Sequence, residues 1–281
     1  MSRIDQKLSD LLDTSEKPSI FKIHGQLRSA KEEAYEPLVV SIGPYHHGKP
    51  KLEEMEKHKV RYFNELLRRT GESAEKYIIA LTDLQDQARR CYAEEISLSD
   101  DAFVDMLCLD GCFVIEFLRK LCQPELYNEN DPIFQMSWLI SATKKDLILF
   151  ENQLPFIVLQ KLFEMTKSQD EGKKLNDLAI LGLSSLMPVS YPGQSSRSTI
   201  PAGHEVVHLL DLMHKNLTAS FSNTLAYPKH EETKTTWQNF YRFKKKKPSL
   251  HKPRIELLHS ETQFKRPIIC ASLHIITLNH S

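Results

Sequence analysis

The chain has 281 residues, of which 41% are hydrophobic and 9% aromatic, enough to bury a real core in one large domain or two modest ones. Its 37 lysine and arginine residues balance its 37 aspartate and glutamate residues, so the formal net charge is zero. This composition excludes an intrinsically disordered chain, and it leaves no overall field that would attract nucleic acid or an anionic membrane.

We expect an intracellular protein, cytoplasmic or peripheral to a membrane. The N-terminus, MSRIDQKLSD, lacks the apolar core of a secretory signal. We expect no transmembrane helix, because the best C-terminal candidate, PIICASLHIITL, is interrupted by His274 and is shorter than the roughly 18 to 20 apolar residues that span a bilayer. The 5 cysteines are an odd number without the spacing of a disulfide scaffold, so most are expected to be reduced core thiols.

A polar leader, residues 1–20, precedes a segment that is rich in turn residues. Between Phe21 and Gly48, short β-prone runs are bounded by Gly25, Pro37 and Gly43. Such punctuation predicts strands and turns.

Helical periodicity begins at Lys51 and continues through the rest of a predicted helical core, residues 21–183. The first helix should stop at Gly71, a second should cover about Ser73 to Cys91, and a third should follow the acidic SDDAF start. The third carries a buried stripe of Phe103, Met106, Leu107, Phe113, Val114, Phe117 and Leu121. A fourth helix is expected near Asp131–Pro132, and another through DLILFENQLPFIVLQKLF with a break or kink at Pro155.

The remainder of the chain is more polar. Residues 184–203 are rich in Ser, Pro and Gly and are expected to form a flexible linker. An amphipathic helix of the same domain is predicted at 204–218, followed by a basic polar loop at 219–254 and a degenerate or truncated segment at 255–281. The predicted fold is therefore mainly α, a multi-helix globular domain with a short β-containing N-terminal segment.

Several motifs, in this order and spacing, resemble the plant DUF247 family, also called UPF0481. They are AYEPLVVSIGPYHHGKPKLEEMEKHKVRYF, ARRCY, FVDMLCLDGCFVIEFL, DPIF and DLILFENQLPFIVLQKLF. The resemblance covers about Phe21 to Leu217, and a weaker echo, IELLHSETQFKR, follows at Ile255 to Arg266.

The resemblance implies a recognition or signalling protein and not a reaction. No enzymatic activity is established for the family at large, and some grass members are implicated in pollen–stigma self-incompatibility. Family members typically continue into a strand-rich half and end in a C-terminal hydrophobic helix, taken to be a membrane anchor. Here the chain stops at Ser281, and the tail from Pro267 does not look like the family, so we expect a truncated form whose protein partner is unknown.

The stretch HEVVHLLDLMH, His204 to His214, offers an alternative function as a zinc-dependent hydrolase. His204, Glu205 and His208 fit the H-E-x-x-H pattern, in which two imidazoles share a helix face and the glutamate activates water. If the helix continues, however, His214 lies about 9 Å further along the axis than His208 and about 120° around it. It could not share their metal.

An amphipathic surface helix accounts for more residues of this stretch than a zinc site does. In that interpretation the polar stripe consists of His204, His208, Asp211 and Lys215, and the apolar stripe consists of Val206, Leu209, Leu210, Met213 and Leu217. We therefore expect an uninterrupted helix that directs its imidazoles outward, with no metal and no cofactor.

Acidic residues in apolar surroundings form a second candidate site. Asp110 lies on the stripe of the third helix, and Asp146 and Glu151 flank the apolar LILF. Buried carboxylates are normally paired or receive backbone hydrogen bonds, and Arg89, Arg90 and Lys144 are available partners. Paired carboxylates could serve acid–base chemistry, but no nucleophile or cofactor motif accompanies them, so we favour a structural polar network.

Three further features favour structural roles. His46 and His47 in GPYHHGK are adjacent and should lie at the rim of a turn fixed by Pro44 and Tyr45. Cys108 and Cys112 share a helix face, without the further ligands that zinc requires. The basic RFKKKKP is expected to be solvated, with peripheral membrane contact favoured over specific nucleic-acid binding. We therefore expect no catalytic, cofactor-binding or metal-binding residues.

Overall fold

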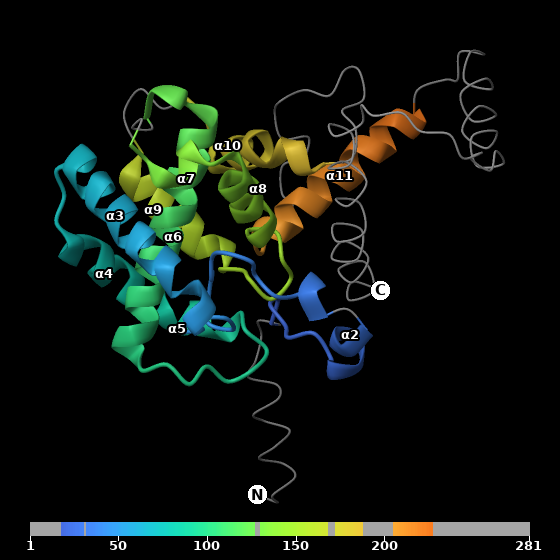
Figure 1. Cartoon of the computed structure of the whole chain (residues 1–281), viewed down its shortest axis with the longest axis horizontal. Coiled ribbons are helices and arrows are strands. Elements are labelled where there is room, and N and C mark those ends of the chain that lie inside the picture. The colour runs from blue at the N-terminus through green and yellow to red at the C-terminus, as the bar shows by residue number, and fades with distance from the viewer. Residues whose placement is uncertain (1–17, 31, 127–129, 168–171, 188–204, 227–281) are drawn as a thin grey trace, which may run out of the picture.

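The computed structural model describes residues 18–30, 32–126, 130–167, 172–187 and 205–226, and these ranges are mainly helical (Figure 1). The helices, in chain order, are α2 (Gly25–Ala30), η1 (Glu32–Ala34), η2 (Pro50–Leu52), α3 (Glu53–Thr70), α4 (Ala74–Thr82), α5 (Gln85–Arg90), α6 (Asp100–Cys122), η3 (Pro124–Leu126), α7 (Pro132–Gln135), α8 (Ser137–Asp146), α9 (Phe156–Thr166), α10 (Leu175–Leu183), η4 (Ser184–Leu186) and α11 (Leu209–Ala226). The prediction of a mainly α fold is confirmed.

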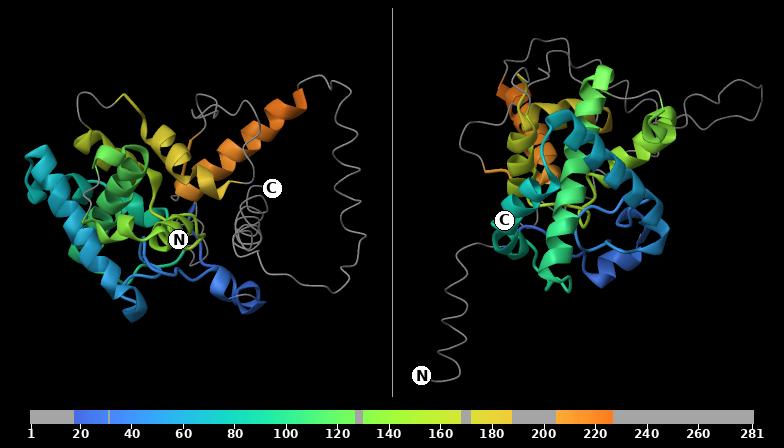
Figure 2. Two further views of the ribbon diagram at one scale, coloured as in Figure 1. Left: turned by 45° about the horizontal axis from the view of Figure 1, so that its top comes forward. Right: turned by 90° about the vertical axis from the view of Figure 1, so that its left-hand side faces the viewer.

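Helix α6 is the centre of the bundle. It begins where the sequence predicts, with the hydroxyl of Ser99 accepting a hydrogen bond from the backbone N–H of Ala102 at 3.3 Å. It packs against α3, α4, α9 and α10, and Figures 1 and 2 show it running through the middle of the bundle. The predicted stripe is buried except for Leu121, which is partly buried, but burial extends around most of the helix because neighbours enclose it on several sides.

The other helices follow the predicted pattern with two corrections. Helix α3 ends at Gly71, whose left-handed backbone (φ 70°) closes the helix as expected. The predicted second helix is divided into α4 and α5. The helix expected through DLILFENQLPFIVLQKLF is interrupted over residues 147–155 rather than at Pro155 alone, because the side-chain amides of Asn152 and Gln153 donate to the backbone carbonyls of Asp146, Leu147 and Leu149.

The prediction of a β-containing N-terminal segment is wrong. Residues 36–43 form bends, and the described ranges contain isolated bridges at Ile20–Tyr92 and Pro155–His208 but no sheet. The reason lies in the hydrogen-bond partners: the backbone N–H groups of Leu38, Val39 and Val40 donate to the carboxylate of Asp146, and that of Ile42 donates to Asn152. Side chains therefore satisfy the donors that a neighbouring strand would have satisfied.

Helix α11 begins at Leu209, so the predicted start at His204 is also wrong. Residues 205–207 are not helical, and the backbone N–H of Phe156 donates to the carbonyl of Val207 at 2.8 Å. The helix then extends away from the bundle (Figures 1 and 2). The basic polar loop predicted at 219–254 does not begin at residue 219, because residues 219–226 belong to α11. His204, most of the predicted linker, the rest of that loop and the segment predicted at 255–281 lie outside the described residues.

Candidate functional site

The charged groups of the core meet where residues 36–49 cross the segment 146–153. Asp110 on α6 is buried, and its Oδ1 lies 2.5 Å from Nζ of Lys59 on α3. Its Oδ2 accepts a hydrogen bond from the backbone N–H of Gly43 at 2.8 Å. Burial opposes the charge on Lys59, but the carboxylates of Asp110 and Glu56 outweigh it and hold the pKa of the ammonium above its usual value. One buried ion pair thus joins α3, α6 and the N-terminal segment.

Asp146, at the end of α8, binds backbone N–H groups of the N-terminal segment. Its carboxylate accepts hydrogen bonds of 2.9, 2.7 and 2.9 Å from the N–H groups of Leu38, Val39 and Val40. Burial raises the pKa of Asp146 to about 6, although these hydrogen bonds act in the opposite direction. The carboxyl group replaces a strand as the acceptor for this stretch of backbone.

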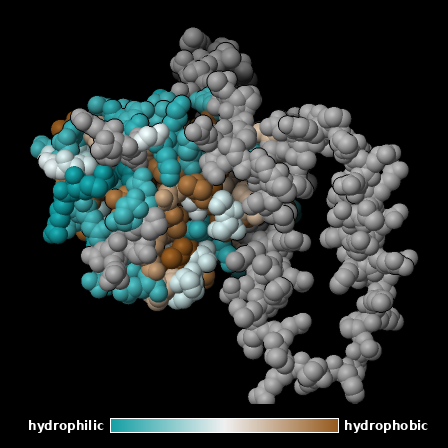
Figure 3. Space-filling view, turned by 90° about the horizontal axis from the view of Figure 1, so that it is seen from above, coloured by the Kyte–Doolittle hydropathy of each residue, from teal (hydrophilic) through white to brown (hydrophobic). Residues whose placement is uncertain are grey.

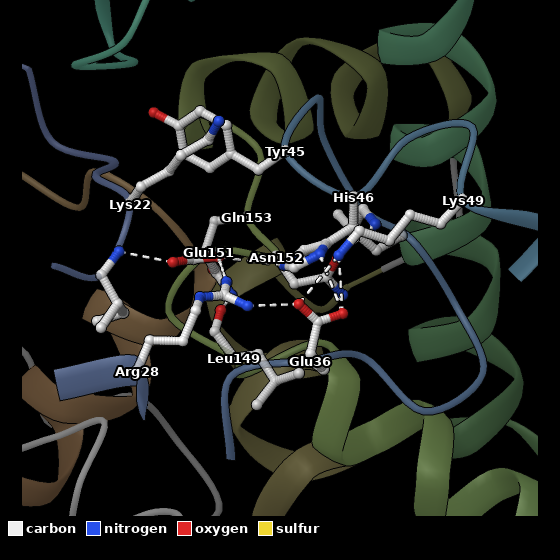
Figure 4. Close-up of polar contacts among 12 residues, drawn as sticks. Lys22, Arg28, Glu36, Tyr45, His46, Lys49, Leu149, Glu151, Asn152 and Gln153 are labelled. Carbon is white, nitrogen blue, oxygen red and sulfur yellow. Dashed lines mark hydrogen bonds and ion pairs between the residues drawn. The ribbon is translucent and has the colours of Figure 1, made fainter. Parts of the chain in front are cut away.

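Glu151 anchors the beginning of the described chain. It is buried, and its Oε1 accepts a hydrogen bond of 2.6 Å from the backbone N–H of Ile23. Its Oε2 pairs with Arg28, whose guanidinium also reaches Glu36 (Figure 4). Residues more than 100 positions apart in the chain are joined in this way.

The burial predicted for Asp110, Asp146 and Glu151 is confirmed, but the predicted partners are not. The three carboxylates contact Lys59, Arg28 and backbone N–H groups. Arg89 instead pairs with Asp100 and donates to the carbonyl of Leu98, and Lys144 donates to Ser185.

Glu36 gathers the basic side chains around this crossing. Nζ of Lys49 lies 3.0 and 2.7 Å from its two oxygens, and Lys51 and Arg28 donate to the same carboxylate. Partial burial opposes the charge, but the hydrogen bonds from Lys49, Arg28 and Lys51 outweigh it and lower the pKa of Glu36 to about 2. Glu36 is thus ionised throughout the physiological range.

His46 lies between two carboxylates of this network (Figure 4). Its Nε2 is 3.5 Å from Oε2 of Glu151 and its Nδ1 is 3.9 Å from Oε2 of Glu36, and neither nitrogen has a hydrogen-bond partner among the described residues. Burial, with the nearby charge of Lys49, lowers the pKa of His46 to about 4. The predicted turn is present, but His46 is 1% exposed, so its expected position at the rim is wrong.

Replacing His46 by glutamine should remove a pH-dependent part of the stability. The unfolded chain takes up the imidazole proton near pH 6.5, whereas the folded protein takes it up only near pH 4, so acid between these values favours unfolding. We expect the free energy of unfolding of the native protein to lose about 2 kcal/mol more than that of His46→Gln when urea denaturation is moved from pH 7 to pH 5. Parallel stability curves for the two proteins would contradict this assignment.

A second charged cluster joins α3, α6 and the start of α7, and the sequence analysis missed it. Asp131 is buried and accepts hydrogen bonds from Arg61, Tyr62 and Lys120 at 2.7, 2.9 and 2.8 Å. Burial opposes its charge, but Lys120 and the other donors outweigh burial and lower the pKa of Asp131. The available signal was the helical spacing that places Lys120 on the buried stripe of α6 with Phe113 and Phe117.

The described part of the HEVVH stretch, residues 205–208, is not helical, whereas the zinc motif places its histidines on one helix. Glu205 is exposed, and His208 precedes α11. The imidazole of His208 is buried, which makes the predicted outward direction wrong, and its Nδ1 accepts a hydrogen bond from the backbone N–H of Asp211 at 3.1 Å. Asp211 in turn accepts from the backbone N–H of Val207 at 3.0 Å, so the pair resembles a capping box at the start of α11.

The remaining predicted candidates are placed as follows. Cys108 and Cys112 are buried and free, and their mutual hydrogen bond together with burial raises the pKa of Cys112. Within the described ranges, no three His, Cys, Asp or Glu side chains are grouped so that they could hold a metal ion. No helix in those ranges is both long and apolar enough to cross a bilayer. RFKKKKP and Cys270 lie outside the described residues.

Comparison with known proteins places the chain in a family. The family model DUF247, described as a plant protein of unknown function, matches residues 20–266. The UPF0481 protein At3g47200 of Arabidopsis thaliana is 38% identical over 163 residues, which cover 56% of this chain and 34% of that protein. The putative UPF0481 protein At3g02645 of Arabidopsis thaliana is 26% identical over 200 residues, covering 70% of this chain and 37% of that protein.

The matched region thus spans about a third of the length of these curated relatives, and no solved structure matches the chain. Because the family match extends over most of the sequence, the chain belongs to the DUF247 family of plant proteins, also named UPF0481, whose function is unknown.

Proposed function

We propose that the chain acts without catalysis, as a protein–protein recognition module that receives its partner at Trp138. The observation that carries the proposal is the exposure of this side chain: Trp138, in the first turn of α8, is 58% exposed, and the neighbouring Met136 is 38% exposed. Tryptophan and methionine are enriched in protein interfaces, and tryptophan often dominates their binding energy.

The scaffold below Trp138 supports this proposal because it is held firmly. Leu139 and Ala142 of α8 are buried, and the carboxylate of Asp146 fixes the end of the helix to the N-terminal segment. On the face seen in Figure 3, apolar side chains of the described residues gather in one area beside hydrophilic ones. An indole on a rigid helix loses little conformational entropy when a partner covers it.

The chemistry of the buried carboxylates also favours a non-catalytic role. Asp110 and Asp146 direct their oxygens to Lys59 and to backbone N–H groups of residues 38–43, which are permanent parts of the fold. A general acid or base must instead reach a proton on the substrate. These carboxylates are therefore better suited to fixing the N-terminal segment than to turnover.

The test compares Trp138→Ala with Ile79→Ala, a matched variant on α4 whose side chain is 57% exposed. The immobilised chain selects proteins from plant extract, and a protein that the native chain and Ile79→Ala retain is then purified and titrated. We expect Trp138→Ala to raise its dissociation constant by roughly 30-fold, the effect of removing a dominant interface residue. Equal affinities for the two variants would reject Trp138 as the recognition site.

A further inference from the structure

A small pocket with unmet hydrogen-bonding capacity opens between the turn at residues 41–49 and the first turn of α3. Its volume is about 320 Å³, at the small end of the range for ligand sites. Its polar lining includes Ser41, His47, Lys49, Glu53 and Glu56, and Leu52 and Pro50 supply an apolar wall. The pocket shares Lys49 and Glu56 with the ion-pair network, whereas Ser41, His47 and Glu53 take part in none of its ion pairs among the described residues and Trp138 does not line it.

Two buried polar atoms of this lining have no partner among the described residues. Ser41 is 1% exposed, and its Oγ forms no hydrogen bond; the buried Nδ1 of His47 forms none either. Buried polar groups are nearly always hydrogen-bonded, and an unsatisfied one costs roughly 1–3 kcal/mol. A hydroxyl that can both donate and accept, beside an imidazole nitrogen, points to a polar ligand in the pocket.

The charges of the lining select the kind of ligand. The lining carries two carboxylates, Glu53 and Glu56, and one ammonium, that of Lys49, which also contacts both oxygens of Glu36. Lys59 occupies only Oε1 of Glu56. Glu53 forms no ion pair among the described residues, although its place in the first turn of α3 suits the helix dipole. The pocket therefore retains excess negative charge, which favours a cationic ligand.

We propose that this pocket binds a small aliphatic amine that also carries a hydroxyl or a second amine. The ammonium group contacts Glu53 and Oε2 of Glu56, the methylene groups lie against Leu52, and the second polar group bonds to Ser41 and His47. The inference goes beyond the proposed recognition function and does not depend on Trp138.

The test uses the 281-residue chain and 4-aminobutan-1-ol as the probe, with butane-1,4-diol as a neutral probe of similar size. Isothermal titration should show saturable one-to-one binding of the amine and none of the diol. In Glu53→Gln the ammonium loses a charged hydrogen-bond partner, so the dissociation constant of the amine should rise about tenfold or more. In Ser41→Ala the ligand loses the hydrogen bond to the serine hydroxyl, so the dissociation constant should rise about fivefold.

Glu54→Gln is the matched control. Glu54 lies in the same acidic first turn of α3 but pairs with Lys57 and does not line the pocket, so this variant should bind the amine as the native chain does. Absence of saturable binding, equal binding of the diol, or equal losses in Glu53→Gln and Glu54→Gln would overturn the proposal. So would a crystal structure in which water bonds to Ser41 and His47 and stays there in the presence of the amine.

Discussion

Replacing Lys59 by methionine should lower the free energy of unfolding by about 3–5 kcal/mol, because it leaves the charge of Asp110 buried without its partner. Both side chains are almost fully buried, at 0% and 1% exposure, and lie in hydrogen-bond contact at 2.5 Å. Methionine fills a similar volume, so the loss reports on the unpaired carboxylate and not on a cavity. The free energy of unfolding of each protein is measured by urea denaturation at pH 7. The values are compared where the native protein and the variant show the same slope of unfolding free energy against urea concentration.

Two variants separate this effect from the general consequences of substitution. In the double variant Lys59→Met with Asp110→Asn, neither member of the buried pair is charged, and the amide oxygen can still accept from the N–H of Gly43, so most of the lost stability should return. Lys57→Met removes an exposed lysine that is paired with Glu54 on the same helix, and it should cause no measurable loss. If Lys59→Met behaved like Lys57→Met, the buried pair would not be important for stability.

Much of the helical architecture could be predicted because its signals are local. The acidic start and the apolar spacing of α6, and the glycine that ends α3, are properties of a few neighbouring residues. The burial of Asp110 followed from the same periodicity. Lys59 lies on the apolar face of α3, and this position in the sequence pattern could have identified it as the partner of Asp110.

The errors arise where distant residues decide the local structure. The stretch LVVSI has the composition of a strand, but its backbone donors meet Asp146 and Asn152, which lie 106 to 110 residues later in the chain. No sequence pattern within residues 36–43 indicates that side chains, and not a neighbouring strand, will accept the backbone hydrogen bonds. His46 was misplaced for the same reason, since Glu151 and Glu36 enclose it only after the two segments cross.

His208 illustrates a different limit of sequence reasoning. The sequence favours a solvent-facing helix over a metal motif for this segment, whereas His208 is buried and precedes α11. The imidazole and Asp211 instead satisfy backbone N–H groups at the beginning of α11. Histidine is not among the preferred capping residues, so the spacing alone did not suggest this role.

Replacing Gly43 by alanine should cost about 2–5 kcal/mol of folding free energy, from a strained backbone and a steric overlap that add to each other. Gly43 has φ 77°, a conformation that residues with a Cβ rarely adopt. A Cβ there would overlap the backbone carbonyl oxygen of Gln153 and would lie 3.2 Å from the hydroxyl of Tyr92. The same position donates its N–H to Asp110, so a shift of the backbone would also disturb the buried ion pair.

Gly48 provides the matched control for Gly43 because it shares the backbone conformation without the overlap. Its φ is 74°, and a Cβ at this position would meet nothing within 4 Å. Gly48→Ala should therefore lose only the cost of the left-handed conformation, about 1–2 kcal/mol. Chemical denaturation gives the free energy of unfolding of each variant. The extra loss in Gly43→Ala over Gly48→Ala is the cost of the steric overlap between a Cβ at position 43 and the backbone of Gln153. Equal losses would mean that the segments 36–49 and 146–153 can separate at this point without cost, contrary to the tight crossing on which the position of His46 depends.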